Sequence, residues 1–440
     1  MRHDRLFIIT FFTDSVDLKI FLLIIMPINV LFEGWINIPH SYAIVNCFQL
    51  IHLVKNYSDK INIYIRELDY LGSWQRQPLI YNSEYNAILS NFKVYTGTEK
   101  IDLVYSIVYP YNITIDNDNN LIKIPKCVFF TSEFATLDPS YFNPNFNNDT
   151  DLMRYLHNNR GTLSFIAPST WSNNGIEKYN VNSTIITHGV DTGIFYKHRD
   201  TTVRNKIREF YRIKDGDILL LNIGGMSGNK GILLILEALN ILVNKLGYQH
   251  YKLMLKGTRD LYCSQKLLET YLETLNQNKI MTHSELNVLL ENHIIFTDKT
   301  LPYREINNIF NACDVYVSPY IAEGFGLTML EALASGLHTI VPKTGSTSDY
   351  IPGILDNGGD TFISYIESRI VSDDTRFFNN IGVNDLLNTL LQNESKFHEF
   401  NNIKYTEMTN YIDKKLSWNH VSDLLYRHFS LTLANASNLL

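Results

Sequence analysis

The stretch Glu323–Gly336, which reads E-G-F-G-L-T-M-L-E-A-L-A-S-G, constrains the fold of this chain more than any other segment. A strand-like apolar run, Cys313–Ser318, precedes it, and a second apolar run, Leu337–Pro342, follows it. A strand, a glycine-containing loop, a helix and a second strand in this order predict a βαβ unit of a parallel sheet. Open α/β sheets bind ligands beyond the carboxyl ends of their strands, so we expect a ligand at this loop.

The same stretch has the chemistry of a site for a sugar phosphate or a nucleotide sugar. Gly326, Leu327 and Thr328 would open the helix with free N–H groups, which favour an anion such as phosphate. Glu323 and Glu331 need another partner, and sugar hydroxyls suit them because hydroxyls donate hydrogen bonds to ionised carboxylates. A purely structural alternative is a capping box, because Thr328 and Glu331 have its spacing.

A second glycine-rich segment, Gly224–Gly231, is called the glycine turn below. It follows an apolar run, Asp217–Ile223, and precedes an amphipathic helical pattern over Ile232–Leu246. Backbone amides, a helix dipole and the ammonium of Lys230 together suit a diphosphate. The glycine turn therefore predicts a phosphate site in the same sheet as the first segment.

The segment from Glu323 to Glu331 resembles the E-x7-E signature of retaining group 1 glycosyltransferases, which form glycosyltransferase family 4. The resemblance covers residues 26 to 429. It implies an α/β protein with the GT-B fold, in which two Rossmann-like, doubly wound parallel-sheet domains face each other across a cleft. It also implies a hexosyltransferase-like enzyme that moves a sugar from a nucleotide-diphosphate sugar to an acceptor with retention of configuration and without a metal.

The glycine turn resembles the G-R-x-x-x-x-K-G segment of the same family. Gly224 and Lys230 match it, whereas Gly225 stands in the arginine position, and Arg259 is the candidate to compensate. The resemblance implies that Lys230, with the amides near Gly225 and those of residues 326 to 328, holds the diphosphate.

The remaining site residues are also assigned by this resemblance. Glu331 would bind the ribose hydroxyls, and Glu323 would lie beside the transferred sugar as a catalytic residue, together with Lys230. Relatives often carry a histidine after a first-domain strand, where this chain has Thr131–Glu133. His40, in the loop after the first predicted strand, is the catalytic candidate to take its place.

The chain is long enough for two domains. Residues 1–25 have no apolar run long enough to span a membrane and no signal-peptide pattern, so we expect a nonessential extension or, alternatively, a weak membrane-associating arm. The expected divisions are an extension (1–25), an acceptor domain (26–200), a linker (201–216), a donor domain (217–410) and a C-terminal helix crossing back to the acceptor domain (411–440).

Composition excludes several classes of function. A net charge of −7 argues against general nucleic-acid binding. The four cysteines form no CxxC, which argues against a metal site or disulfide framework and favours a reducing, cytoplasmic setting, at most peripheral to a membrane. Asp116-Asn-Asp118 resembles a metal-binding D-x-D but has the pattern of a hairpin turn. The expected partners are a nucleotide-diphosphate sugar and a glycan, lipid or protein acceptor.

Two other functions remain open at this stage. The chain could be a GT-B binding or scaffold protein without turnover, which Gly225 in the arginine position would favour. It could also be a GT-B epimerase of sugar nucleotides or a phosphorylase.

Overall fold

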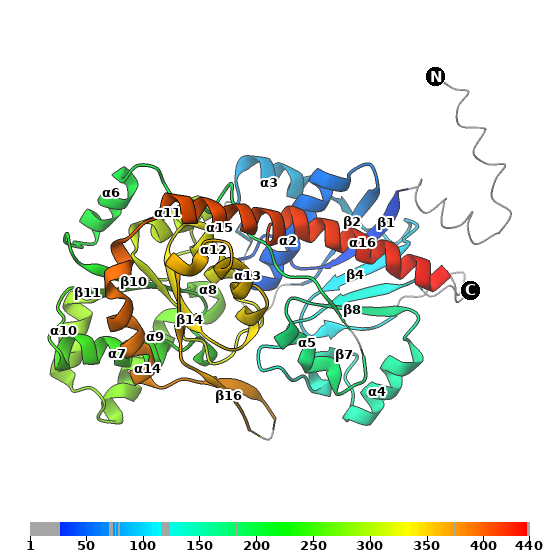
Figure 1. Ribbon diagram of the computed structural model, residues 1–440. Coiled ribbons are helices and arrows are strands. Elements are labelled where there is room, and N and C mark those ends of the chain that lie inside the picture. The colour runs from blue at the N-terminus through cyan, green and yellow to red at the C-terminus, as the bar shows by residue number, and fades with distance from the viewer. Residues whose placement is uncertain are drawn as a thin grey trace.

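The computed structural model describes residues 27–69, 74, 76–77, 80–115, 124–181, 183–373 and 375–437. The expected extension at 1–25 and the Asp116–Asp118 turn lie outside these residues. The described chain forms two α/β units side by side, which occupy the blue-to-cyan and the green-to-yellow parts of Figure 1.

The first unit is built on a seven-stranded parallel sheet of order β3-β2-β1-β4-β6-β8-β9. All five residues of β4, a Leu-Val-Tyr-Ser-Ile run, are buried, as expected for a parallel sheet with helices on both faces. The strands are β1 (Ile28–Gly34), β2 (Ile61–Glu67), β3 (Lys93–Val94), β4 (Leu103–Ile107), β6 (Lys126–Phe129), β8 (Leu163–Ala167) and β9 (Thr184–Ile185), with β5 (Tyr111–Asn112) and β7 (Phe142–Asn143) forming a small separate pair. The helices are α2 (Ser41–Tyr57), α3 (Ser83–Ser90), α4 (Asp149–Asn158) and α5 (Thr170–Glu177).

The second unit has a six-stranded parallel sheet of order β12-β11-β10-β13-β14-β15. Its strands are β10 (Ile218–Ile223), β11 (Tyr251–Lys256), β12 (Ile294–Thr297), β13 (Val315–Val317), β14 (His338–Pro342) and β15 (Ile363–Ile366). Its helices are α6 (Thr202–Phe210), α7 (Ile232–Asn240), α8 (Arg259–Tyr262), α9 (Ser264–Gln277), α10 (His283–Asn292), α11 (Tyr303–Ala312), α12 (Leu327–Ala334), α13 (Ile351–Leu355) and α14 (Val383–Asn393). In both sheets the strand order reverses beside the first strand, which is the Rossmann arrangement, so the predicted fold class is confirmed.

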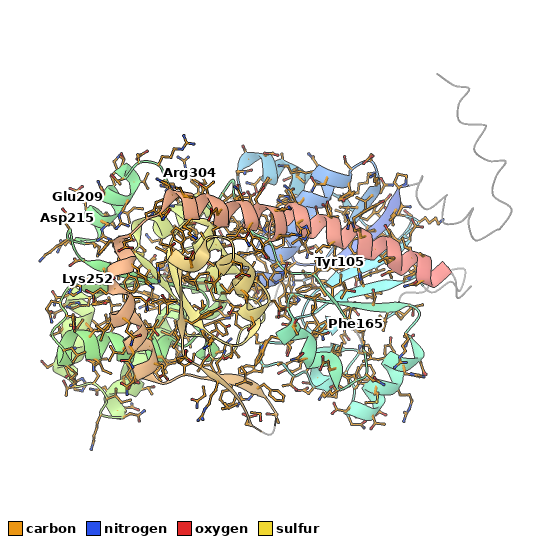
Figure 2. The ribbon with its side chains drawn as sticks, viewed as in Figure 1. Tyr105, Phe165, Glu209, Asp215, Lys252 and Arg304 are labelled. Carbon is orange, nitrogen blue, oxygen red and sulfur yellow. The ribbon has the colours of Figure 1, made fainter. Side chains whose placement is uncertain are left out.

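Side-chain burial follows the two sheets. Tyr105 and Phe165 lie buried in the first unit, whereas Glu209, Asp215 and Arg304 are exposed on the second (Figure 2). The helix predicted over Ile232–Leu246 changes its winding, because α7 ends at Asn240 and a π-helical turn covers Ile241–Lys245.

The C-terminal segment connects the two units. Helix α15 (Asn402–Lys415) packs on the second unit, and α16 (Trp418–Ser437), red in Figure 1, runs across to the first. The Trp418 ring stacks on Phe48 of α2 with ring centroids 5.2 Å apart, so Trp418 anchors α16 in the core of the first unit. Val190 pairs with Ser417, so the two crossings between the units run side by side.

A hairpin of β16 (Arg369–Ser372) and β17 (Phe377–Asn380) projects from the second unit. Its Phe377 N–H donates to the Phe134 carbonyl of the first unit at 3.0 Å. The Arg376 guanidinium lies over the Phe134 ring, 5.2 Å from its centroid. The hairpin therefore ties the loop after β6 to the second unit.

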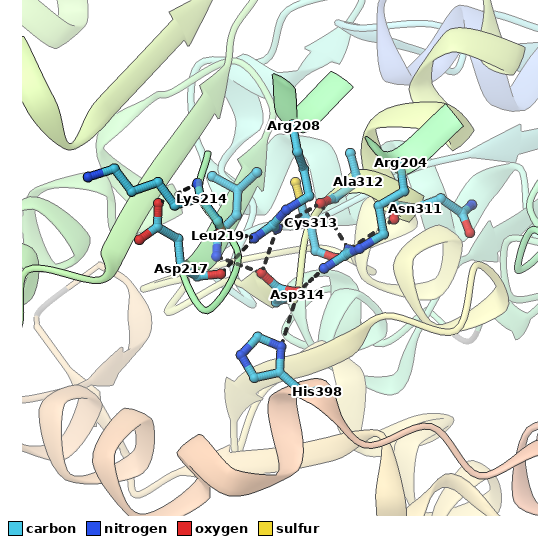
Figure 3. A network of polar contacts seen from close by, with 10 residues as sticks. All are labelled: Arg204, Arg208, Lys214, Asp217, Leu219, Asn311, Ala312, Cys313, Asp314 and His398. Atoms are coloured by element: carbon cyan, nitrogen blue, oxygen red, sulfur yellow. Dashed lines mark hydrogen bonds and ion pairs between the residues drawn. The ribbon is translucent and has the colours of Figure 1, made fainter. Parts of the chain in front are cut away.

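A buried carboxylate fastens α6 to the second sheet (Figure 3). Asp314, which is 4% exposed, pairs with Arg204 at 2.6 Å and with Arg208 at 3.0 Å, and accepts from the Leu219 amide at 2.8 Å. Burial alone would raise the pKa of Asp314, but His398 and the two guanidinium groups lower it to about 2. The carboxylate is therefore ionised at neutral pH, and the linker helix is held by a charged network.

Candidate active site

The helix of the E-x7-E segment starts two residues earlier than a capping box at Thr328 requires. Gly326, with φ of +96°, is the N-cap of α12, and no side chain caps this helix. The Thr328 hydroxyl instead shares a 2.6 Å hydrogen bond with the Tyr316 hydroxyl. The capping-box alternative is therefore wrong, and the first amides of α12, including those of Leu327 and Thr328, have no preceding helical carbonyl to bond.

Glu331 is a buried acid whose carboxyl group contacts no polar group of the described chain. Its side chain lies on α12 and the residue is 8% exposed. Among the described residues, none forms a hydrogen bond or ion pair with its carboxyl group, and burial raises the pKa of Glu331 to about 8. An isolated carboxyl group in this position is costly unless a ligand supplies hydrogen-bond donors.

Lys230 brings the two predicted motifs into contact. It ends a short 3-10 turn, η4 (Gly228–Lys230), and its ammonium donates to the Glu323 carboxylate at 2.7 Å. A second carboxylate, that of Glu133, lies 3.6 Å from the same ammonium. Burial alone would lower the pKa of Lys230, but the two carboxylates outweigh it and raise this pKa.

Glu133 is the site residue that sequence reasoning did not assign. It belongs to the loop after β6, in the first unit, and its carboxylate accepts from the Asn229 amide of the glycine turn at 2.8 Å. The Trp171 indole donates to the Glu133 carbonyl at 2.7 Å, which positions the loop. The available signal was a run of polar residues directly after a buried strand.

An aromatic ring lies beside the glycine in the arginine position. A Cβ on Gly225 would lie 2.8 Å from the Tyr262 ring. Arg259 does not extend toward this place, because its guanidinium forms two hydrogen bonds with Asp298, at 2.9 and 3.1 Å. At the first residue of the glycine turn, the Gly224 amide donates to the Lys256 carbonyl at 3.0 Å. This hydrogen bond joins the ends of β10 and β11.

His40 lies on the first unit and faces the second. Its Nδ1 accepts from the Tyr42 amide at 3.3 Å and so caps α2. Its ring stacks on Trp74 with centroids 4.9 Å apart and faces Tyr262 at 6.3 Å. Burial lowers the pKa of His40 to about 4, so the ring is neutral near pH 7. The structure therefore shows a structural role for Nδ1 and leaves its predicted catalytic role a hypothesis.

The two units touch directly at the E-x7-E segment. The Gly324 carbonyl accepts from the hydroxyls of Ser169 and Ser172, at 2.6 and 3.1 Å. A Cβ on Gly324 would lie 2.0 Å from Cγ2 of Thr131, so only glycine fits this contact. The Thr170 amide also donates to the Asp349 carboxylate. The site is therefore formed by both units together.

Two further properties of the described residues concern metal ligands and membrane-spanning helices. Within the described ranges, no three histidine, cysteine or acidic side chains gather closely enough to bind a metal ion. The part of the chain that the structure describes also contains no helix with the length and apolar character to cross a membrane.

Comparisons with known proteins agree with this geometry. Residues 203–352, about a third of the chain, match the family model described as Glycosyl transferases group 1. A segment of 62 residues is 32% identical to Protein CapJ of Staphylococcus aureus. The matched segment makes up 14% of this chain and 16% of that protein. The chain thus spans about a sixth of that relative.

Solved structures show the fold. HepE of Anabaena, in a complex with UDP and glucose, matches with a TM-score of 0.59 and 14% identity over 91% of this chain and 99% of that one. A sucrose-phosphate synthase of Thermosynechococcus elongatus matches with a TM-score of 0.61 and 12% identity over 93% and 100%. A glycosyltransferase of Rickettsia africae matches with a TM-score of 0.60 and 12% identity over 92% and 99%. The fold is GT-B.

Proposed function

We propose that this protein is a retaining glycosyltransferase of the family 4 type, which transfers a sugar from a nucleotide-diphosphate sugar to an acceptor without a metal ion. The observation that carries the proposal is the buried, unpartnered carboxyl group of Glu331, on the helix that also opens the anion site. Ribose hydroxyls would supply the missing hydrogen bonds to Glu331, and the gain would favour its ionised form.

The diphosphate would bind between the glycine turn and the start of α12. Lys230 would exchange its Glu323 contact for phosphate oxygens, and the amides of Leu327 and Thr328 would add donors at the positive end of the helix dipole. These groups are held in place before reaction, so they can stabilise the charge that develops on the leaving diphosphate. In this mechanism the Lys230 ammonium and the backbone amides supply the positive charge.

Glu323 and the first unit would act on the transferred sugar. Once released from Lys230, the Glu323 carboxylate can accept hydrogen bonds from sugar hydroxyls and orient the ring. Gly324 packs against Thr131 of the first unit, so the sugar would be enclosed between the units and protected from water. Retention by attack on the face of the leaving group is the mechanism that the family resemblance implies.

The choice of donor is guided by the structural neighbours. HepE has been crystallised with UDP and with UDP-glucose, so we propose uridine-diphosphate sugars as the first donors to test. The four cysteines are free thiols, which supports a cytoplasmic setting for the acceptor and the donor pool.

The decisive experiment is turnover of a donor panel. The purified protein is incubated with UDP-, GDP- and ADP-sugars, and nucleoside diphosphate release is measured with and without candidate acceptors. The parent should release nucleotide from one donor, and Glu331→Ala and Lys230→Ala should lose this activity. Release with none of the donors, or equal release by all three proteins, would contradict the proposal.

A second candidate is a GT-B protein that binds a nucleotide sugar without turnover. It is favoured by the engagement of Lys230 with two carboxylates and by the absence of an arginine at Gly225. Saturable donor binding without nucleotide release, in the presence of acceptor extracts, would support this second function over the first.

A further inference from the structure

The loop after β6 places an acid from the first unit against the diphosphate-binding groups of the second. One oxygen of Glu133 accepts from Asn229 at 2.8 Å, and the other lies 3.6 Å from the Lys230 ammonium. Asn229 is fixed in turn, because its side chain also donates to the Ala322 carbonyl at 2.9 Å. The carboxyl group of Glu133 therefore borders the place where the diphosphate is expected.

The charges of this cluster do not suit a diphosphate as they stand. One ammonium, Lys230, faces the carboxylates of Glu323 and Glu133, so the cluster has a net negative charge when all three groups are ionised. A nucleotide-diphosphate sugar adds negative charge on both phosphates, and like charges at such distances repel strongly in a partly buried site. Gly225 offers no cation, and Arg259 is bound to Asp298.

Apart from Lys230, the groups that face Glu133 supply no positive charge to balance its carboxylate. The charged and titratable side chains around it are Lys230 of η4, Glu323 of the loop before α12, Tyr262 of α8, Tyr42 of α2, Tyr141 of η3 (Pro139–Tyr141) and Arg376 of the β16–β17 hairpin. Arg376 is paired with Asp373 and covers Phe134. Lys230 is therefore the one cation that contacts the Glu133 carboxylate among the described residues.

Hydrogen bonds hold the backbone at Glu133 and at the next residue, so the loop cannot easily move the Glu133 carboxyl group away from Lys230. The Glu133 carbonyl accepts from Trp171 at 2.7 Å, and the next carbonyl, of Phe134, accepts from Phe377 of the hairpin at 3.0 Å. Because one tie comes from each unit, the loop stays at the site while the units remain together. Uptake of a proton from solvent is then the direct way for this side chain to lose its charge.

We propose that Glu133 is a residue of the donor site that takes up a proton when a nucleotide-diphosphate sugar binds beside Lys230. The inference rests on the proposed function. The neutral carboxyl group then borders the diphosphate and can donate a hydrogen bond to a phosphate or sugar oxygen, which a carboxylate cannot do. Glu133 is in this sense a binding and positioning residue that the first unit contributes.

The electrostatics of the donor-free site point the same way. Partial burial, which leaves 45% of the Glu133 side chain exposed, and the Glu323 charge raise the pKa of Glu133, and Lys230 is the group that opposes them. A diphosphate would draw the ammonium toward itself and add negative charge, so both changes would raise this pKa further. The contribution of Glu133 to donor affinity should therefore be greatest at low pH and should fall as pH rises from the pKa of Glu133 in the donor-free protein to its higher pKa in the complex.

The test is isothermal titration calorimetry with UDP-glucose, GDP-mannose and ADP-glucose, whose diphosphates do not titrate near neutrality. Each titration is repeated in buffers of different ionisation enthalpy, which gives the number of protons bound with the donor. Glu331 is expected to release a proton to solvent when ribose binds, so the readout is the difference between the parent and Glu133→Gln. Gln keeps the shape and the acceptor for Asn229, and melting curves verify the fold of each variant.

With the donor that binds, the parent should take up about half a proton or more beyond Glu133→Gln near pH 7. Glu133→Gln should bind this donor roughly tenfold more tightly at high pH, because it imitates the neutral acid. Glu291→Gln, an exposed acid on α10, serves as the matched control and should equal the parent. Equal proton numbers, or weaker binding by Glu133→Gln, would overturn this inference alone. Binding of none of the three donors by either protein would overturn the proposed function and this inference with it.

Discussion

The ammonium of Lys230 donates a 2.7 Å hydrogen bond to the carboxylate of Glu323, across 93 positions of the chain. The contact joins the glycine turn to the E-x7-E segment at the carboxyl edge of one sheet. It also means that the cation expected to hold a diphosphate already has a carboxylate partner in the donor-free protein. A donor must therefore compete for Lys230, and this competition releases Glu323 for the sugar.

Replacement of Lys230 should damage donor use more than stability. A charge-assisted hydrogen bond contributes about 1.5–3 kcal/mol, so Lys230→Met should lower kcat/KM for the donor by roughly 10- to 100-fold. Nucleotide release at varied donor concentration measures this. Lys252→Met, far from the site on β11, is the control and should retain full activity. Unchanged kcat/KM in Lys230→Met would remove the lysine from the donor site.

Glu331 should make the protein less stable as pH rises. Its pKa is raised from 4.5 to about 8 by burial, so the folded state holds a proton that the unfolded state loses in this interval. The native protein is therefore penalised progressively between these values, by a few kcal/mol at about pH 8. Glu331→Gln lacks this group, and its melting temperature relative to the parent should increase with pH. A difference that does not vary with pH would show that Glu331 is not buried in the uncharged form.

Asp314 should be the main electrostatic contact of the linker helix. Asp314→Ala leaves the buried guanidinium of Arg208 unpaired, so we expect a loss of about 3–5 kcal/mol in the free energy of unfolding. Because the pKa of Asp314 is lowered to about 2, the stabilisation by the ionised form is present above the unfolded value of 3.8 and is lost as pH falls toward 2. Urea unfolding at neutral and acidic pH measures both effects. Asp356→Asn, an exposed acid directly after α13, is the control and should unfold as the parent does.

A methyl group at Gly324 should clash with Thr131, and shortening Thr131 should relieve the clash. The new Cβ would meet Cγ2 of Thr131 at 2.0 Å, so Gly324→Ala should push the two units apart, cost about 1–3 kcal/mol and reduce activity. Thr131→Ser deletes the obstructing Cγ2 atom. The double variant Gly324→Ala/Thr131→Ser should therefore recover part of the stability and of the nucleotide release. If Gly324→Ala were as active and as stable as the parent, the two units would not be in contact there.

Two side chains for which local spacing offered a role are engaged by tertiary partners instead. Thr328 has the spacing to cap α12, but the Tyr316 hydroxyl from β13 bonds its side chain and Gly326 occupies the N-cap. Arg259 follows a strand at the donor edge, yet Asp298 binds its guanidinium in two places. No spacing along the chain encodes either partner.

The amino-acid sequence by itself determined the two parallel sheets, the helices that cover them and the positions of the two glycine-bearing loops. These features depend on the periodicity of apolar residues and on glycine within a few positions of one another. The tertiary structure alone decided that Glu133 reaches Asn229, 96 positions away, and that the Glu331 carboxyl group has no polar partner within the part of the chain that the structure describes. Such contacts depend on how the two units pack together, because packing determines which charges lose water and which other groups replace it.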